Sequence, residues 1–333
     1  MFTEAIEAIL RDRATSEAVR AIENGGSAAS IWNAVEEAGF LELLTPESAG
    51  GAGLPLSSIE PIFTAFGRYA VPVPLAQSIA ARALLRDSGV TAPAGMTTLA
   101  GSCLRRADGS LKAPQVPFGM ICDNVLANVD GALLLLDATQ AEREPDGVHG
   151  SSCGTLRWRS GAVPVALGSN GAEVLLFSAA IHAAAIAGAM DRVFAMTLQY
   201  CNDRSQFGKS IGKFQAVQHQ LSVMAEHVAS AGMASALAFS GTGAVPERLA
   251  TAIGKARTSM AVPLIAATAH ALHGAIGVTA EYDLQLYTRR MHEWRIADGS
   301  EIFWNGVVGS AVLAQEHGTI VDFARTAPHC VAA

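Results

Sequence analysis

The run from Arg204 to Gln215 has the pattern Arg-x-x-Phe-Gly-Lys-x-Ile-Gly-x-Phe-Gln, which combines residue types suited to binding a phosphate-bearing molecule. Arg204 carries a planar cation whose geometry matches that of a diphosphate, and Phe207 offers a flat apolar face. Gly208 and Gly212 allow the backbone to turn closely. A structural alternative is that Arg204 stabilises a helix C-terminus while Phe207 packs in the core.

The elements around this run have a clear helical period. The pattern predicts helices and loops up to about residue 85, short strands from about 97 to 177, and long helices from 178 onward. Long helices are expected at residues 178–204, 214–239, 246–273, from about 281, and 300–316. Candidate strands lie at residues 120–122, 125–127, 132–136, 161–167 and 173–177. Long helices with short glycine-containing links predict an antiparallel bundle.

The predicted fold is therefore mainly α with a small β domain. We expect an N-terminal helical domain at residues 1–95, a middle antiparallel β domain at 96–177 and a C-terminal four-helix bundle at 178–333.

The composition excludes several classes of protein. Half of the 333 residues are hydrophobic and 16% are charged, so apolar area for a core is abundant and a disordered chain is excluded. A net charge of −7 without a basic block argues against a nucleic-acid partner. Five cysteines without a ligand spacing, and no histidine cluster, predict no metal site. Short apolar runs and the lack of a signal-peptide pattern predict no membrane span and a cytoplasmic protein.

The run from Arg204 to Gln215 closely resembles the signature of the acyl-CoA dehydrogenase family. The stretch His273-Gly274-Ala-Ile-Gly277 resembles the same family, and further matching stretches lie at residues 47–54, 67–74, 188–192 and 283–290. The resemblance covers nearly the whole chain in order and agrees with the α-β-α layout.

The resemblance implies FAD as the cofactor, held in part by a neighbouring subunit. The implied cofactor-binding residues are Arg204, Phe207, Gln215, Gly274, Gly277 and Ser300.

The resemblance also implies a catalytic base. The family removes the α-proton of an acyl-CoA thioester with a carboxylate, which most members carry in a Glu-Gly-Thr segment, while flavin N5 takes the β-hydrogen as hydride. The matching residues are Asp298-Gly-Ser300, so Asp298 is the candidate base, and Glu301 is the second candidate. Some members place the base at the start of the first bundle helix, where this sequence has Ser178, which cannot serve. Asp298 is also suited to cap a helix or close a turn, and the two roles are compatible.

The predicted β region departs from the family pattern. It is short, and the Thr-Glu and Ala-Gly-Ser-Asp signature of the family has no clear counterpart between Gly101 and Ala172. In this respect the chain resembles the shorter subunits of heteromeric family members, whose complete sites are assembled between unlike chains.

The expected function is FAD-dependent α,β-dehydrogenation of an acyl-CoA thioester. The alternatives are a non-catalytic or half-site subunit of a heteromeric acyl-CoA dehydrogenase, and a flavin oxidase or monooxygenase of the same fold. The expected partners are an acyl-CoA substrate, an electron-transfer flavoprotein as acceptor, and either a second copy of the chain or a second acyl-CoA dehydrogenase-like chain.

Overall fold

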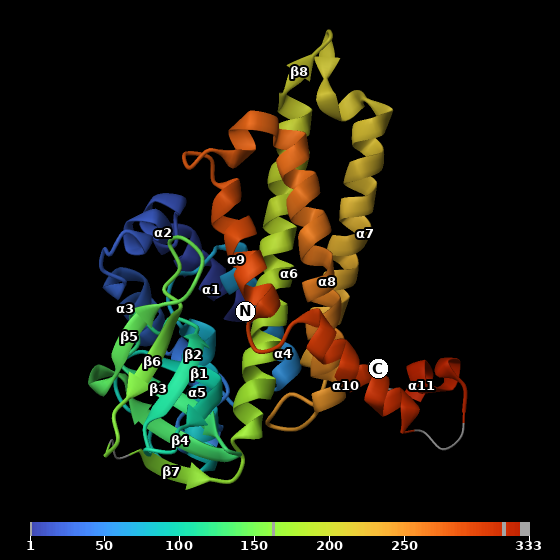
Figure 1. The fold of residues 1–333 in the computed structure, drawn as a ribbon. Coiled ribbons are helices and arrows are strands. Elements are labelled where there is room, and N and C mark those ends of the chain that lie inside the picture. The colour runs from blue at the N-terminus through green and yellow to red at the C-terminus, as the bar shows by residue number, and fades with distance from the viewer. Residues whose placement is uncertain (1, 162–163, 315–317, 327–333) are drawn as a thin grey trace.

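The computed structural model describes residues 2–161, 164–314 and 318–326. It confirms the predicted fold class: N-terminal helices and a seven-stranded sheet lie beside one half of a long helical bundle (Figure 1). The parts of the expected ranges that fall on residues 1, 162–163, 315–317 and 327–333 lie outside the described residues.

The N-terminal part is helical, as predicted. Thr15 caps its second helix by accepting a hydrogen bond from the backbone N–H of Ala18 at 3.2 Å. The elements are α1 (Phe2–Arg13), α2 (Ser16–Glu23), α3 (Ala29–Glu37), η1 (Phe40–Glu42), η2 (Glu47–Ala49), α4 (Leu56–Arg68) and α5 (Leu75–Asp87).

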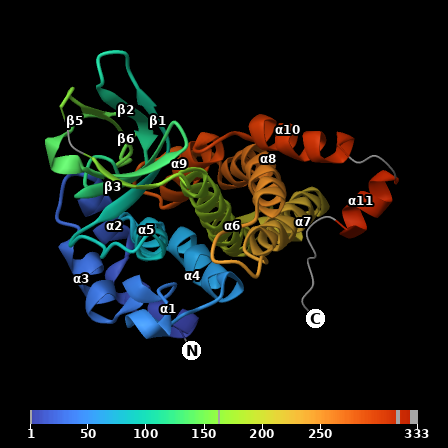
Figure 2. The ribbon, with the colours of Figure 1, turned by 90° about the horizontal axis from the view of Figure 1, so that it is seen from below.

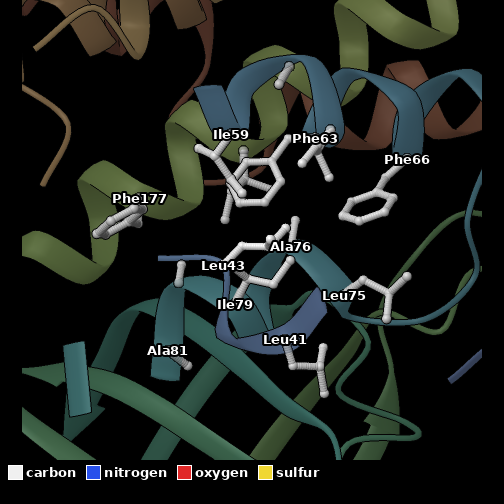
Figure 3. Close-up of a cluster of buried hydrophobic side chains, with 14 of the residues drawn as sticks. Leu41, Leu43, Ile59, Phe63, Phe66, Leu75, Ala76, Ile79, Ala81 and Phe177 are labelled. Carbon is white, nitrogen blue, oxygen red and sulfur yellow. The ribbon is translucent and has the colours of Figure 1, made fainter. Parts of the chain in front are cut away.

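A hydrophobic core joins these helices to the start of the bundle. Ile59, Phe63 and Phe66 recur at helical spacing along α4 and share one face, which packs against Ile79 of α5 (Figure 3). Phe177, from the first bundle helix, is fully buried in the same core. Because burying each large apolar side chain contributes about 1.5–3 kcal/mol, this core fixes the N-terminal helices against the bundle.

The middle region is a sheet with the strand order β5-β6-β2-β1-β3-β4-β7. Its pairs are antiparallel, as predicted, except that β1 and β3 run parallel with Thr97 opposite Asn124. The strands are β1 (Thr97–Arg105), β2 (Leu111–Val116), β3 (Asn124–Val129), β4 (Ala132–Asp137), β5 (Glu142–Pro145), β6 (Gly154–Trp158) and β7 (Val165–Gly168). Strand β1 packs on α5 and on the first bundle helix, so the sheet is held to both helical layers.

Two of the expected strands are wrong. Residues 120–122 form a turn, in which the backbone N–H groups of Ile121 and Cys122 both donate to the Phe118 carbonyl oxygen. Residues 173–177 belong to the first turns of helix α6 (Ala172–Asp203), where Val174 and Phe177 bury one helix face. A short apolar run does not distinguish a buried strand from a buried helix, which explains this error. The division of the chain into three domains stays a prediction, and its expected boundary after residue 177 falls within α6.

The C-terminal helices surround α6. Figure 2 shows α6 between the N-terminal helices and α7 and α8. The remaining elements are the hairpin β8 (Ser205–Gln206) and β9 (Lys209–Ser210), η4 (Ile211–Lys213), α7 (Gln215–Ala238), α8 (Arg248–His273), η5 (Gly274–Val278), α9 (Leu284–Ile296), α10 (Glu301–Leu313) and α11 (Ile320–Thr326).

Two long helical stretches, Ala172–Asp203 and Arg248–Val278, are apolar enough to cross a membrane by length and composition alone. The sequence patterns had predicted no such stretch. In the first of them, 78% of the most apolar window is buried inside the protein, as in the core helix of a globular domain. Length and composition are therefore weak evidence for a membrane span here.

Candidate active site

Asp298 lies in a tight turn between α9 and α10. The φ angles of +51° at Asp298 and +100° at Gly299 place two successive residues in the left-handed region. Trp304 Nε1 donates to the Asp298 carbonyl oxygen at 3.0 Å, and Lys255 Nζ donates to the Gly299 carbonyl oxygen at 3.1 Å. Contacts from α8 and α10 therefore support a backbone conformation that would be unfavourable in isolation.

The Asp298 carboxylate contacts the first bundle helix. Ser178 Oγ donates to Asp298 Oδ2 at 2.6 Å, and His182 Nδ1 lies 3.1 Å from the same oxygen without the alignment of a hydrogen bond. Of the two structural roles considered for Asp298, the turn is confirmed and the helix cap is wrong, because Ser300 is the N-cap residue of α10 and the Asp298 side chain bonds to α6. The two sequence positions considered for the base, 178 and 298, therefore meet in space.

A cavity of about 450 Å³ opens beside Asp298, between the sheet and the bundle. Gly101 of β1 and Gln115 of β2 form one wall, and Leu175 of α6 and Phe303 of α10 form another. A β-carbon added at Gly101 would lie 2.5 Å from Asp298 Oδ1, so the glycine allows β1 to approach the carboxylate closely. Oδ1 consequently faces the strand that lines the cavity.

His182 lines a second, smaller cavity. The walls of that cavity are mostly apolar and include Phe63, Phe66, Ile181 and Trp294. The Asp298–His182 contact thus lies between the larger cavity and an apolar one that extends toward α4.

Lys255 of α8 is fully buried behind the Asp298 turn. Its ammonium group donates to the carbonyl oxygens of Trp294 and Arg295 at 2.9 Å, as well as to that of Gly299. These carbonyl groups lie at or just beyond the end of α9, where a helix leaves them without partners. Burial lowers the pKa of Lys255 to about 7, and the negative charge of Asp298 opposes this shift.

Glu301, the second candidate base, is paired with a cation. Arg295 Nε lies 3.2 and 3.1 Å from its two carboxylate oxygens, and Arg295 Nη2 donates to it as well. Hydrogen bonds from Arg295 hold the pKa of Glu301 below its usual value. Glu301 is therefore less suited than Asp298 to accept a proton.

The other predicted site residues lie at the opposite end of the bundle. Arg204 follows the last residue of α6, and Phe207 lies in the turn of the β8–β9 hairpin at the tip (Figure 1). Gln215 begins α7 just after the hairpin. The short helix η5, which contains Gly274 and Gly277, lies at the same end of α6, because His273 before it stacks on Tyr200 of α6 with ring centroids 4.5 Å apart. We call this set the tip cluster: Arg204, Phe207, Gln215, Gly274 and Gly277.

The structural alternative, in which Phe207 packs in the core, is wrong, because Phe207 is 91% exposed. The Phe207 ring lies perpendicular to that of Phe214 at a centroid distance of 6.2 Å, and Lys209 Nζ lies 4.3 Å from the Phe214 centroid. Arg204 is also exposed. The tip cluster thus presents a cation and an aromatic face to whatever adjoins this end of the molecule.

Comparison with known proteins agrees with this geometry. Residues 172–310 match the family described as acyl-CoA dehydrogenase, C-terminal domain. Acyl-CoA dehydrogenase IpdE2 of Mycolicibacterium smegmatis is 29% identical over 304 residues, which are 88% of this chain and 91% of that protein. Residues 172–310 therefore have the sequence pattern of an acyl-CoA dehydrogenase C-terminal domain, and the chain is similar over most of its length to proteins of that family. Members of this family are FAD-dependent oxidoreductases that act on CH–CH groups.

Solved structures share the acyl-CoA dehydrogenase fold over nearly the whole chain. A chain of the ChsE4–ChsE5 complex from Mycobacterium tuberculosis has a TM-score of 0.83 at 21% identity, covering 95% of this chain and 97% of that one. The steroid acyl-CoA dehydrogenase variant Tcur3481–Tcur3483 has a TM-score of 0.80 at 25% identity, with coverages of 93% and 96%. The short sheet is therefore compatible with a complete fold of this family.

The residues present fit the flavin cofactor of the acyl-CoA dehydrogenases. At the tip, Arg204 suits the diphosphate and the exposed ring of Phe207 suits contact with a flat aromatic group. Beside Asp298, the cavity offers a space between the sheet and the bundle, with glycine at the point of closest approach. These two places would hold different parts of the cofactor, in different copies of the site.

The structure brings Asp298, Ser300 and Glu301 together and places the tip cluster elsewhere. The sequence patterns did not reveal that Lys255 and His182 lie next to the candidate site at Asp298. A signal for His182 was available, since it lies one helical turn after position 178 and shares its face. A signal for Lys255 was its place as a lone cation among small uncharged residues on one face of α8, which include Thr251, Ala252 and Ser259.

Proposed function

We propose that the chain is a subunit of an FAD-dependent acyl-CoA dehydrogenase in which Asp298 removes the α-proton of the acyl thioester. The observation that carries this proposal is the position of Asp298: it is 10% exposed, lines the cavity between sheet and bundle, and has Oδ1 directed at the wall of that cavity. A carboxylate held rigidly in such a cavity is positioned to take a proton from a bound substrate.

Different residues of the chain have different roles in the proposed reaction. Bound FAD supplies the acceptor for the β-hydrogen, which leaves as hydride. Asp298 Oδ1 takes the α-proton, while Ser178 holds Oδ2. The apolar walls next to His182, including Phe63 and Phe66, exclude water and suit the hydrocarbon part of an acyl group.

The tip cluster and Asp298 serve different copies of the site. Ser178, which contacts Asp298, lies near the start of α6, and Arg204 follows its last residue. At the helical rise of 1.5 Å per residue these two positions are about 40 Å apart, which is longer than an extended FAD molecule. We therefore propose that each complete site combines the cavity of one chain with the tip of another.

The partner chain is either a second copy or a related chain. One similar structure is a ChsE4–ChsE5 complex and another is a steroid acyl-CoA dehydrogenase. The similarity to these two proteins supports a heteromeric assembly. Because one of them is a steroid acyl-CoA dehydrogenase, a polycyclic acyl-CoA is the first substrate to test. The same similarity is compatible with the half-site alternative, in which this chain only completes the site of its partner.

The test of the base is the variant Asp298→Asn in the purified complex. Because the amide cannot accept the proton, turnover of acyl-CoA should fall at least about 10²-fold, while FAD content and thermal stability stay unchanged. Glu301→Gln is the control, and it should cost much less because Glu301 is already bound to Arg295. Unchanged turnover in Asp298→Asn would show that this chain does not supply the base.

The electron acceptor is tested separately. We propose an electron-transfer flavoprotein, so the substrate-reduced enzyme should be oxidised slowly by air and rapidly by that acceptor. Stopped-flow measurement of flavin absorbance distinguishes the two acceptors. Rapid oxidation by oxygen would instead identify a flavin oxidase or monooxygenase of the same fold.

A further inference from the structure

His182 is a buried titratable residue next to the proposed base. Its side chain is 2% exposed, and Nδ1 lies 3.1 Å from Asp298 Oδ2. Nδ1 has no aligned hydrogen bond, although it lies within hydrogen-bond distance of that carboxylate oxygen. A buried ring nitrogen without a partner is unfavourable, so a small rotation that completes the bond to Asp298 is favoured.

Two side chains of α6 approach the same oxygen of the Asp298 carboxylate. Ser178 and His182 are four residues apart, share one helix face, and both approach Asp298 Oδ2. Their contacts leave Oδ1 directed toward Gly101 and the cavity. The carboxylate is therefore held unsymmetrically, with one oxygen bound to the protein and the other available to a substrate.

The charges around this pair come from other elements. Lys255 of α8 bonds to the carbonyl oxygen of Gly299, and Glu301 of α10 is neutralised by Arg295 of α9. These groups fix the backbone of the turn, and they leave the orientation of the Asp298 side chain to Ser178 and His182. The apolar cavity on which His182 borders has Gln77 as its only other polar side chain among the lining residues.

We propose that His182 is a positioning residue for Asp298. Its Nδ1–H donates to Oδ2 and, together with Ser178, holds Oδ1 toward the α-carbon of the substrate. This inference rests on the proposed role of Asp298 as the base. It adds a histidine that contacts the carboxylate without contacting the reacting atoms.

The test uses a series of variants at position 182 in the purified, FAD-loaded complex. Asn places its amide N–H close to the position of Nδ1, Gln places it closer to that of Nε2, and Leu offers no donor. We expect His182→Gln and His182→Leu to lower kcat on the order of tenfold with little change in KM, because the interaction orients the base rather than binds the substrate. His182→Asn should stay within about threefold of the wild type.

A second readout separates positioning from packing. Exchange of the substrate α-proton with solvent deuterium reports the base step alone, and its rate should fall in parallel with kcat. Introduced into Asp298→Asn, His182→Leu should cause little further loss, since residues that act as one unit are not additive. Ser178→Ala supplies an independent test with a smaller structural change, and it should also lower kcat more than it changes KM.

The outcomes are distinguishable. Equal losses in His182→Asn and His182→Leu, or an undiminished loss in the Asp298→Asn background, would show that His182 only fills space and would overturn this inference. Unchanged turnover in Asp298→Asn itself would overturn the proposed base. If His182→Leu fails to fold, the comparison of His182→Asn with His182→Gln, together with Ser178→Ala, still tests the inference.

Discussion

At the scale of single residues, Lys255 shows how a buried charge can serve the site without touching the substrate. Its ammonium group replaces water for the carbonyl oxygens at the end of α9, next to the turn that carries Asp298. A cation is favourable at a helix C-terminus, which offsets part of the desolvation of the charge. The lysine thus fixes the backbone of the turn, while Ser178 of α6 fixes the Asp298 carboxylate.

The lowered pKa of Lys255 predicts a dependence of stability on pH. The folded value is about 7 against an ordinary value of 10.5, so between these pH values the unfolded chain binds a proton that the folded chain does not. The free energy of unfolding should therefore rise with pH across this window, and the destabilisation should be fully present below about pH 7. Urea unfolding at a series of pH values measures this slope.

Lys255→Met is the matched variant, because it keeps the length of the side chain and removes the titrating group. Its unfolding free energy should rise less steeply between about pH 7 and 10.5 than that of the wild type, although it should be lower overall because the carbonyl groups lose their donor. Identical slopes in the two proteins would contradict the lowered pKa.

At the scale of elements, the contact between α4 and α6 depends on glycine. A β-carbon at Gly188 would overlap the Thr64 carbonyl oxygen, and one at Gly67 would overlap the Ala185 carbonyl oxygen. Small residues on both helices let the two backbones approach closely. Because α6 also carries Ser178 and His182, this contact helps to set the position of the site relative to the N-terminal core.

Gly188→Ala should therefore destabilise the protein by about 1–3 kcal/mol or more, since the added methyl group meets backbone atoms that cannot move independently. The control is Gly232→Ala on the exposed face of α7, where a β-carbon meets nothing within 4 Å. Helix propensity predicts that this control is neutral or stabilising by about 0.5–1 kcal/mol. Denaturant unfolding compares the two, and similar losses would argue against the proposed close packing.

At the scale of the whole molecule, the candidate site residues lie at two ends of the bundle. The cavity with Asp298 lies beside the sheet. The β8–β9 hairpin, which carries Phe207 of the tip cluster, lies at the end of the bundle far from the sheet (Figure 1). Exposed apolar side chains on α10, such as Ile302 at 79% and Leu313 at 87%, suit contacts between chains. Under the proposed assembly, a single chain offers two incomplete sites.

This division predicts complementation between inactive variants. Arg204→Ala loses the tip, and Asp298→Asn loses the base, so each should be inactive by itself. If the assembly contains two copies of this chain that complete each other, mixed dimers have one intact site, and random mixing should restore about a quarter of the wild-type activity. Activity is measured after refolding or coexpressing the two variants.

The absence of recovery, with both variants folded and assembled, would show that the chain pairs with an unlike partner instead of a second copy of itself. Thermal unfolding of Arg204→Ala provides the control for folding. Its midpoint without cofactor should match that of the wild type, because Arg204 is exposed.

Much of the fold could be predicted from the sequence because helical period and glycine stops are local signals. The predicted helix at residues 214–239 differs from α7 by one residue at each end, and α8 ends at His273, as predicted, because Gly274 follows with a positive φ. The strand expected at 173–177 was wrong, since a run of four apolar residues fits a buried strand and a buried helix equally well.

The sequence by itself also determined the family and the identity of the candidate residues, because residue types at fixed spacing are visible without coordinates. Only the tertiary structure decided how they combine. The partner of Asp298 on α6 is 120 residues away in the chain, and the separation of the tip cluster from Asp298 follows from the length of one straight helix. Contacts between residues so distant in sequence depend on how the helices pack, and no local pattern encodes that packing.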